Sequence, residues 1–154
     1  MNAELPIGSE LEFFDIVVSS DLSVHGLLAA LEGRSLHIPF GAETAIDHTW
    51  VDDWVSAVLA ALDHQAHRFD VYNVSSGVAT TVAELANIVS ELVPGAQLSV
   101  GPGLYRHGNR IELVRKGALD ISRARDEFGW RPRFDIRSGL AAYVEALRQQ
   151  SARG

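Results

Sequence analysis

Most basic side chains of this sequence lie in one segment. Residues 106–137 hold nine of the thirteen lysines and arginines; this segment contributes +4 to the net charge of −7, and the rest of the chain contributes −11. A guanidinium group matches the oxygen geometry of phosphates and carboxylates. The segment therefore predicts binding of a small anion, and the alternative is a solvated, charged helix face.

Histidine is a second residue type able to do chemistry near neutral pH. His48 stands in a polar setting next to Asp47, which suits a general base in a pocket; the alternative is a strand histidine satisfied by its neighbours. His64 and His67 have the spacing of metal ligands, but only Asp63 is a further ligand nearby, so we expect no metal. Cysteine is absent and no Gly-x-Ser-x-Gly turn occurs, which argues against a thiol nucleophile and a hydrolase triad.

Composition places the chain among globular proteins. It has 154 residues, of which 47% are hydrophobic and 21% are charged, enough for one domain with its own core. The acidic net charge argues against a nucleic-acid partner. No run of about 18 apolar residues occurs, and the first 20 residues lack a basic start followed by an apolar core. We therefore expect a cytoplasmic protein without a membrane partner.

Helical and strand periodicities alternate along the chain. Apolar spacing and capping residues predict helices that begin at Ser23, at Asp52 or Asp53, at Thr80 or Thr81, at Asp120 or Ser122, and at Ser138. Glu84 completes a capping box with Thr81. In the last helix, Leu140, Tyr143, Val144 and Leu147 are expected to face inward. Strands are predicted over residues 13–18, 36–40, 48–51, 69–74 and 98–100. This order predicts an α/β body with a small mixed sheet and packed helices.

Three blocks follow one another in a recognisable order. The first is Asp47–Ala57, an aromatic and acidic strand-to-helix junction. The second joins Val71–Gly77 to a Thr-capped helix start, and the third joins Leu119–Ala124 to Glu127–Pro132. Together they resemble the C-terminal portion of the extended short-chain dehydrogenase/reductase family, the NAD-dependent epimerases and dehydratases. The resemblance implies a substrate-binding lobe over residues 23–150, an N-terminal extension with a strand over 1–22, and a tail over 151–154.

Two motifs of that family do not occur in this chain. The glycines never meet the Gly-x-x-Gly-x-x-Gly spacing that lets a backbone approach a pyrophosphate. The family's Tyr-x-x-x-Lys is absent as well, because the single lysine, Lys116, follows Glu112 by four residues. We therefore expect no cofactor in this chain and no redox chemistry by the chain alone. NAD(P) enters only if a partner supplies the Rossmann half.

The resemblance also implies substrate contacts. Arg106, within Tyr105–Asn109, matches the family's arginine that reaches the pyrophosphate of a nucleotide-sugar, although Asn109 replaces the usual acid and Ile46 stands where a second basic residue is common. The remaining candidate substrate-binding residues are Asn73, Ser75, Ser76 and His48, and His48 is also the weak catalytic candidate.

Other residues of the three blocks have structural interpretations. We expect Asp53 to accept hydrogen bonds from free amides at a helix start. Trp130 and Pro132 are expected to lock a turn, and Asn73 has the alternative role of capping a strand end.

Three functions are consistent with this sequence. The leading hypothesis is an epimerase/dehydratase-like substrate-binding half that works with a partner chain carrying the dinucleotide domain. The alternatives are a cofactor-independent enzyme or small-molecule binder, and a dimerising interaction module. In each case an apolar junction surface is expected, covered by a homodimer or a partner. Its candidates are Phe13, Phe14, Ile16, Val18, Trp50 and Trp54.

Overall fold

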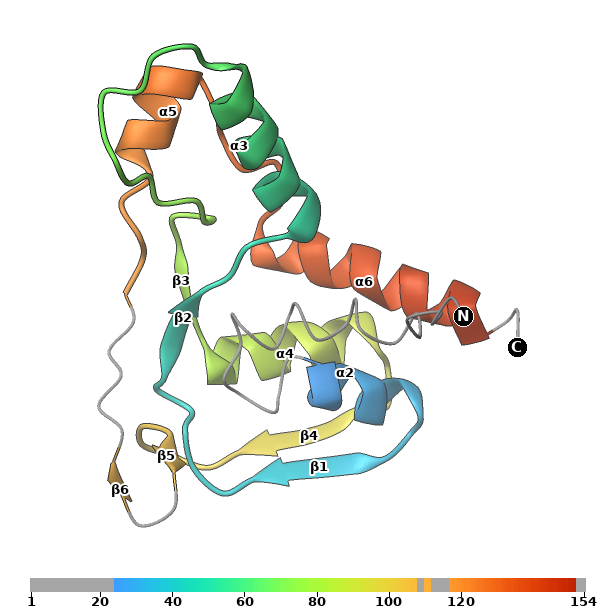
Figure 1. The fold of residues 1–154 in the computed structure, drawn as a ribbon. Helices are drawn as coiled ribbons and strands as arrows, with labels where there is room; N and C mark the ends of the chain where they lie inside the picture. The colour runs from blue at the N-terminus through green and yellow to red at the C-terminus, as the bar shows by residue number, and fades with distance from the viewer. Residues whose placement is uncertain (1–23, 108–109, 112–116, 152–154) are drawn as a thin grey trace, which may run out of the picture.

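A computed structural model describes residues 24–107, 110–111 and 117–151 of the chain (Figure 1). Helices and strands alternate along these residues as the sequence periodicity predicts. In chain order they are α2 (Val24–Leu31), β1 (Ser35–Ile38), β2 (Ala45–Asp47), α3 (Val51–Asp63), β3 (Ala79–Thr81), α4 (Val82–Leu92), β4 (Gln97–Val100), β5 (Arg106–His107), β6 (Arg110–Ile111), α5 (Ser122–Phe128) and α6 (Ile136–Ser151).

The described strands form three separate pairs. β1 and β4 are parallel, with Ser35 opposite Gln97, whereas β2 and β3 are antiparallel, with Asp47 opposite Ala79. β5 and β6 make a short antiparallel pair, with Arg106 opposite Ile111. The α/β class is confirmed, and its small sheets take the form of these pairs.

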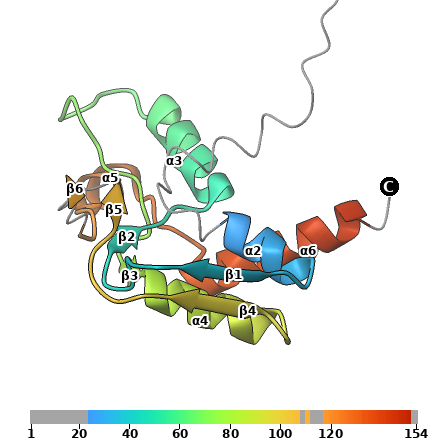
Figure 2. The same cartoon turned by 90° about the horizontal axis from the view of Figure 1, so that it is seen from below.

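The larger core lies between the β1–β4 pair and three helices. Leu27 of α2 and Leu85 and Val89 of α4 are at most 1% exposed, and Val144 of α6 packs with them. Figures 1 and 2 show α2 and α4 beside the β1–β4 pair, with α6 packed on α4. The inward positions predicted for α6 are confirmed at Leu140, Val144 and Leu147.

A second, smaller core joins α3 to α5. Ala57 of α3, Ala124 of α5 and Trp130 are buried together, and Val74 and Phe128 pack against them. This part forms the upper end of the molecule in Figure 1, where α3 and α5 stand apart from the β1–β4 pair. The described part of the chain has no helix long and apolar enough to cross a membrane.

Local capping decides where the helices begin. The capping box is confirmed: the Thr81 hydroxyl accepts from the Glu84 amide, and the Glu84 carboxylate accepts from the Thr81 amide. The strand predicted at 48–51 is wrong, because β2 ends at Asp47 and α3 begins at Val51. The predicted Asp52 or Asp53 cap is wrong too, because Trp50 occupies the capping position and makes no side-chain capping bond there.

Two other predicted boundaries differ from the structure. Helix α6 begins at Ile136, two residues before the predicted start at Ser138, because Asp135 Oδ1 accepts the Ser138 amide at 2.7 Å and caps the turn earlier. The strand predicted at 69–74 is wrong, because no backbone of the described residues pairs with this segment. The strand predicted at 13–18 lies outside the described residues.

Candidate functional site

Residues 105–119 include four of the basic residues, and we call this segment the arginine-rich loop. Hydrogen bonds at the two ends of β2 anchor its first and last residues. Thr44, the residue before β2, is buried and its Oγ1 accepts a hydrogen bond from the Tyr105 amide at 2.7 Å. Asp47, the last residue of β2, accepts one from the Leu119 amide at 2.9 Å. A three-residue strand is only about 10 Å long, so the segment between Tyr105 and Leu119 leaves and rejoins the body close together.

This arrangement places the predicted anion-binding residue beside β2. Arg106 begins β5, directly after the anchored Tyr105. Gly41 has φ +114°, a conformation that favours glycine, and a Cβ there would lie 3.6 Å from the Tyr105 Cα, so the backbones approach closely. The Arg106 side chain lies outside the described residues, as do the side chains of the other basic residues from Arg110 to Lys116. The predicted role of Arg106 therefore stays a prediction.

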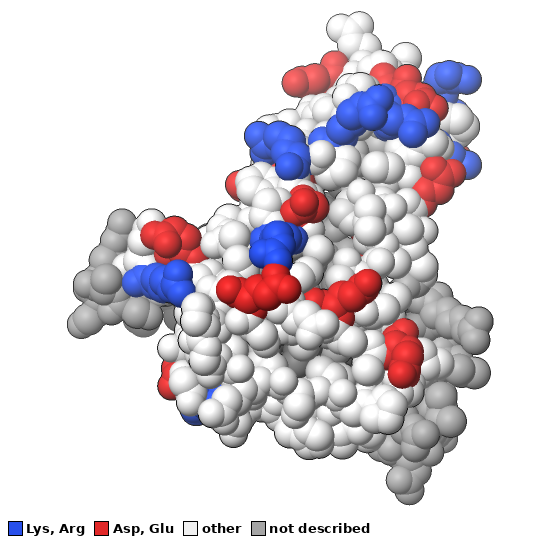
Figure 3. Space-filling model, turned by 180° about the vertical axis from the view of Figure 1, so that it is seen from behind, with Lys and Arg blue, Asp and Glu red and all other residues white. Residues whose placement is uncertain are grey.

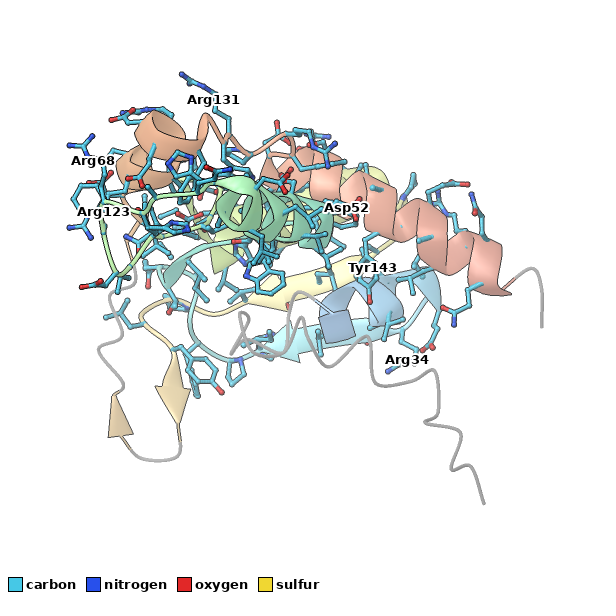
Figure 4. All side chains as sticks on the ribbon, turned by 45° about the horizontal axis from the view of Figure 1, so that its top comes forward. Arg34, Asp52, Arg68, Arg123, Arg131 and Tyr143 are labelled. Atoms are coloured by element: carbon cyan, nitrogen blue, oxygen red, sulfur yellow. The ribbon has the colours of Figure 1, made fainter. Side chains whose placement is uncertain are left out.

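The arginines of the second half of the segment are engaged within the protein. Arg125 pairs with Asp126 at 2.7 Å, Arg137 pairs with Glu91, and Arg133 contacts the buried Asp53 at 3.3 Å. Figure 3 shows basic and acidic side chains interspersed over the α5 end of the molecule, and Arg131 points outward in Figure 4. For these three residues the charged, paired helix face is the better interpretation.

Asp47 joins the turn at Ser76 to the end of the arginine-rich loop through its hydrogen bonds. The sequence patterns did not predict this role. The residue is 7% exposed, and its carboxylate accepts hydrogen bonds from the Ser76 hydroxyl at 2.6 Å, the Gly77 amide at 3.1 Å and the Leu119 amide. Hydrogen bonds to a buried carboxylate are strong. Asp47 therefore fixes the turn after Val74 and the end of the arginine-rich loop to the same strand. An acid closing a short strand was the signal available in the sequence.

The residues predicted to bind substrate in this turn make hydrogen bonds within the protein. Ser75 is 1% exposed and its hydroxyl accepts from Thr49 at 3.1 Å, while the Ser76 hydroxyl donates to Asp47. The Asn73 side chain is exposed and donates to the Asp120 carbonyl at 3.0 Å, holding the segment against the start of α5. These bonds position the turn, and Asn73 is the most accessible of the three.

His48 lies on the other side of the chain from that turn. Asp47 and Thr49 both bond the serine turn, and the intervening His48 lines a cavity of about 30 Å³ with Leu85, Leu140 and Tyr143. Alternate residues of an extended chain point to opposite faces. The structure therefore does not bring His48 and the two serines into one cleft. A cavity of this size accommodates one or two water molecules and no sugar.

The environment of His48 favours the neutral ring. Burial lowers the pKa of His48 below its ordinary value, and the Ile46 backbone and the Asp47 charge act in the opposite direction without offsetting it. Neither ring nitrogen has a hydrogen-bond partner among the described residues. A neutral imidazole with a lowered pKa is a weaker base than an exposed histidine, which does not favour His48 as a general base.

Trp130 has the structural role predicted for it, whereas Asp53 is structural in a different way from the predicted helix-start cap. Asp53 is 1% exposed, and its Oδ2 accepts hydrogen bonds from the amides of Arg133 and Phe134 at 3.0 and 2.9 Å. The Trp130 indole donates to the Asp53 carbonyl and to Ser56 Oγ. The two residues together fasten the turn after α5 to the first turns of α3.

A buried carboxylate also organises the histidine pair at the end of α3. Glu127 Oε1 accepts from the Arg68 amide and the Tyr72 hydroxyl, both at 2.8 Å, and lies 3.6 Å from His64. Burial raises the pKa of Glu127, but these donors and the nearby positive charges outweigh it and lower the pKa overall. His67 stacks edge-on against Phe128. Within the described residues no three His, Cys, Asp or Glu side chains form a metal site.

Every described helix from α3 to α6 carries a carboxylate at its N-terminus. Asp52 and Asp53 lie in the first turn of α3, and Glu84 occupies that of α4. Asp120 accepts from the Ser122 amide at α5, and Asp135 does so from Ser138 at α6. A helix N-terminus binds a phosphate through free amides and a favourable dipole. These helix starts are already occupied by acids and do not fit a pyrophosphate.

Comparison with known proteins gives a consistent set of relatives. No protein-family model matches the chain. It is 32% identical over 123 residues to a UDP-glucose 4-epimerase of Mycolicibacterium smegmatis, covering 80% of this chain and 37% of the enzyme. It is 27% identical to the dTDP-4-dehydro-6-deoxyglucose reductase of Escherichia coli, covering 69% of this chain and 32% of that protein.

Solved structures give the same result. The UDP-glucose 4-epimerase of Thermotoga maritima, crystallised with UDP-glucose, superposes with a TM-score of 0.72 at 28% identity, covering 90% of this chain and 42% of that enzyme. The UDP-glucuronic acid 4-epimerase of Bacillus cereus, solved with UDP-glucuronic acid and NAD, shares the fold at 20% identity and a TM-score of 0.67. The chain therefore spans about a third of the curated relatives' length and about two fifths of these structures.

Proposed function

Because the chain belongs to the extended short-chain dehydrogenase/reductase family and matches its C-terminal portion, we propose that it is a nucleotide-sugar-binding half of an epimerase or dehydratase. The diphosphate of the nucleotide-sugar binds at the arginine-rich loop that follows Tyr105, with Arg106 as its principal contact. The chain supplies substrate recognition and does not run redox chemistry alone.

The observation that carries this proposal is the pair of hydrogen bonds that anchor both ends of the arginine-rich loop to β2. Thr44 and Asp47 hold both ends of the loop through buried side chains, so ordering the loop around a ligand costs less conformational entropy than ordering a free segment would. The loop also contains four basic residues, Arg106, Arg110, Arg115 and Lys116. A diphosphate is the anion class that a cluster of guanidinium groups recognises best.

The acidic side chains at the starts of α3 to α6, in contrast, disfavour a dinucleotide there. The helix starts that would face a pyrophosphate carry Asp52, Asp53, Glu84, Asp120 or Asp135, and a like charge at a helix start repels a phosphate. We therefore place NAD(P) in a dinucleotide domain that the described residues do not include. When bound there, the nicotinamide supplies hydride chemistry, and this chain holds and orients the sugar.

Ligand binding to the purified full chain tests the proposal. UDP and UDP-glucose are expected to raise the melting temperature and to bind in calorimetry, whereas NAD leaves both unchanged. Arg106→Ala removes one charge-assisted contact, worth about 1.5–3 kcal/mol, and weakens UDP binding by roughly 10- to 100-fold. Arg148→Ala, which alters an exposed arginine on α6, is the matched control and retains the affinity.

Two results would contradict this function. NAD binding to the isolated chain with an affinity comparable to UDP would show that the dinucleotide site is present after all. Equal UDP affinity in the wild-type chain and in Arg106→Ala would remove the proposed contact.

A further inference from the structure

The β1–β4 pair has one covered face and one open face. Successive side chains of a strand point to opposite faces, and the apolar residues of both strands pack against the larger core. The exposed residues on the other face are Ser35, His37, Gln97 and Ser99. Figure 2 looks onto this face from below and shows the pair in front of α4. These four side chains are therefore accessible to molecules in solution.

Two of these residues form a hydrogen-bonded pair. The parallel register places His37 directly opposite Ser99, and His37 Nδ1 lies 2.7 Å from Ser99 Oγ. The same register places Ser35 opposite Gln97. The pairing of the two strands therefore fixes one serine beside an imidazole and another serine beside an amide on the same open face.

The His37–Ser99 geometry is that of a hydroxyl next to a base. A serine hydroxyl is a weak nucleophile unless an adjacent base takes its proton, and the heavy-atom distance that this transfer requires is about 2.6–3.2 Å. A neutral imidazole whose Nδ1 carries no proton accepts a hydrogen bond from the Ser99 hydroxyl. In this tautomer His37 is in position to take the proton as Ser99 attacks an electrophile.

Hydrogen bonds from other serines go to weaker bases. The Ser76 hydroxyl donates to the Asp47 carboxylate at 2.6 Å, and the Ser138 hydroxyl donates to the Asp135 carboxylate at 2.7 Å. A carboxylate is a much weaker base than imidazole. Among the described residues, Ser99 therefore combines an exposed hydroxyl with an imidazole partner.

We propose that Ser99 is an acylation site that reacts with activated esters, with His37 as its general base. Ser99 Oγ forms a bond to the ester carbonyl carbon while its proton passes to His37 Nδ1. The bond from that carbon to the leaving oxygen breaks, and the leaving group departs with the electron pair and takes up a proton. The products are an acyl-serine and a free alcohol or phenol, and nothing is oxidised or reduced. The reaction does not depend on nucleotide-sugar binding.

Acetylation of the full-length chain by p-nitrophenyl acetate tests this site. The chain contains no cysteine, which would compete strongly for an activated ester, and peptide mass spectrometry assigns the acetyl group to individual residues. Ser35 is the matched internal control, because it is exposed on the same face and lies opposite an amide. At about pH 8, where an ordinary histidine is neutral, we expect Ser99 to be acetylated at least about tenfold faster than Ser35.

A single variant separates the base from the hydrogen bond. His37→Gln keeps a hydrogen-bonding side chain opposite Ser99 but removes the base, so we expect the acetylation rate of Ser99 to fall to that of Ser35. Position 37 is exposed, and we expect the variant to keep the melting temperature of the wild-type chain.

Each other outcome overturns the proposal. Equal acetylation rates of Ser99 and Ser35 in the wild-type chain mean that exposure alone sets the rate. An unchanged Ser99 rate in His37→Gln means that His37 is not the base. An acetyl group found on the His37 ring, and still formed in Ser99→Ala, means that the imidazole itself is the nucleophile.

Discussion

Replacing Asp53 tests how the two parts of the structure are held together. Asp53→Ala removes the acceptor of the Arg133 and Phe134 amides, at 3.0 and 2.9 Å, in a position that is 1% exposed. Each hydrogen bond to a charged group is worth about 1.5–3 kcal/mol, so the expected loss for two bonds is about 3–6 kcal/mol. The contact with the Arg133 side chain adds little, because that side chain is 64% exposed. For a chain of this size the melting temperature should fall by about 10 °C.

Thermal and urea unfolding of the variant, followed by circular dichroism, measure this loss. Asp52→Ala is the matched control: it lies in the same helical turn and removes the same charge, but its side chain is exposed and accepts from the exposed Trp50 indole. We expect Asp52→Ala to cost less than about 1 kcal/mol. Similar losses in the two variants would refute the reasoning, since only the helix dipole and net charge are common to both.

Two further predictions concern single side chains. Thr81→Ala breaks the capping box of α4 and should cost about 1 kcal/mol in urea unfolding, whereas Thr80→Ala, which alters a neighbouring hydroxyl without a capping role, serves as the comparison. Burial lowers the pKa of His48, so the unfolded chain takes up its proton at higher pH than the folded chain, and stability declines as pH falls below about 6.5. His48→Leu should reduce this decline between about pH 7 and about pH 5, while His37→Leu, at an exposed position, should not. If the free energy of unfolding changes with pH in the same way in both variants, burial of His48 is not the cause.

Local signals in the sequence predicted much of the fold. The Thr81–Glu84 pair, the strands around Leu36 and Leu98 and the inward positions of α6 follow from residues within one or two turns of each other. Such features depend on hydrogen bonds and packing that the segment itself largely provides. The start of α3 was missed because two consecutive acids suggested a cap, whereas Asp53 is used by the distant turn at Arg133.

The site was harder to predict, for a different reason. A serine hydroxyl has the same hydrogen-bonding capacity toward a substrate as toward a carboxylate of its own chain. Nothing local to Ser76 indicates that its hydroxyl donates a hydrogen bond, 2.6 Å long, to Asp47, which lies 29 residues earlier. The arginine-rich loop is likewise anchored over long sequence separations. Thr44 lies 61 residues before Tyr105, and Asp47 lies 72 residues before Leu119. Only the three-dimensional structure brings these groups together.

The remaining disagreements between sequence and structure are concentrated in one region. Periodicity correctly predicts a helix at α3, and the composition of 69–74 is typical of a strand, yet the helix exposes its stripe and the strand-like segment pairs with no described residue. In a self-sufficient fold, local preference and tertiary packing agree. Helices α2, α4 and α6 meet that condition, since their apolar faces are buried against each other. In α3 and residues 69–74, by contrast, the local preference has no matching partner among the described residues.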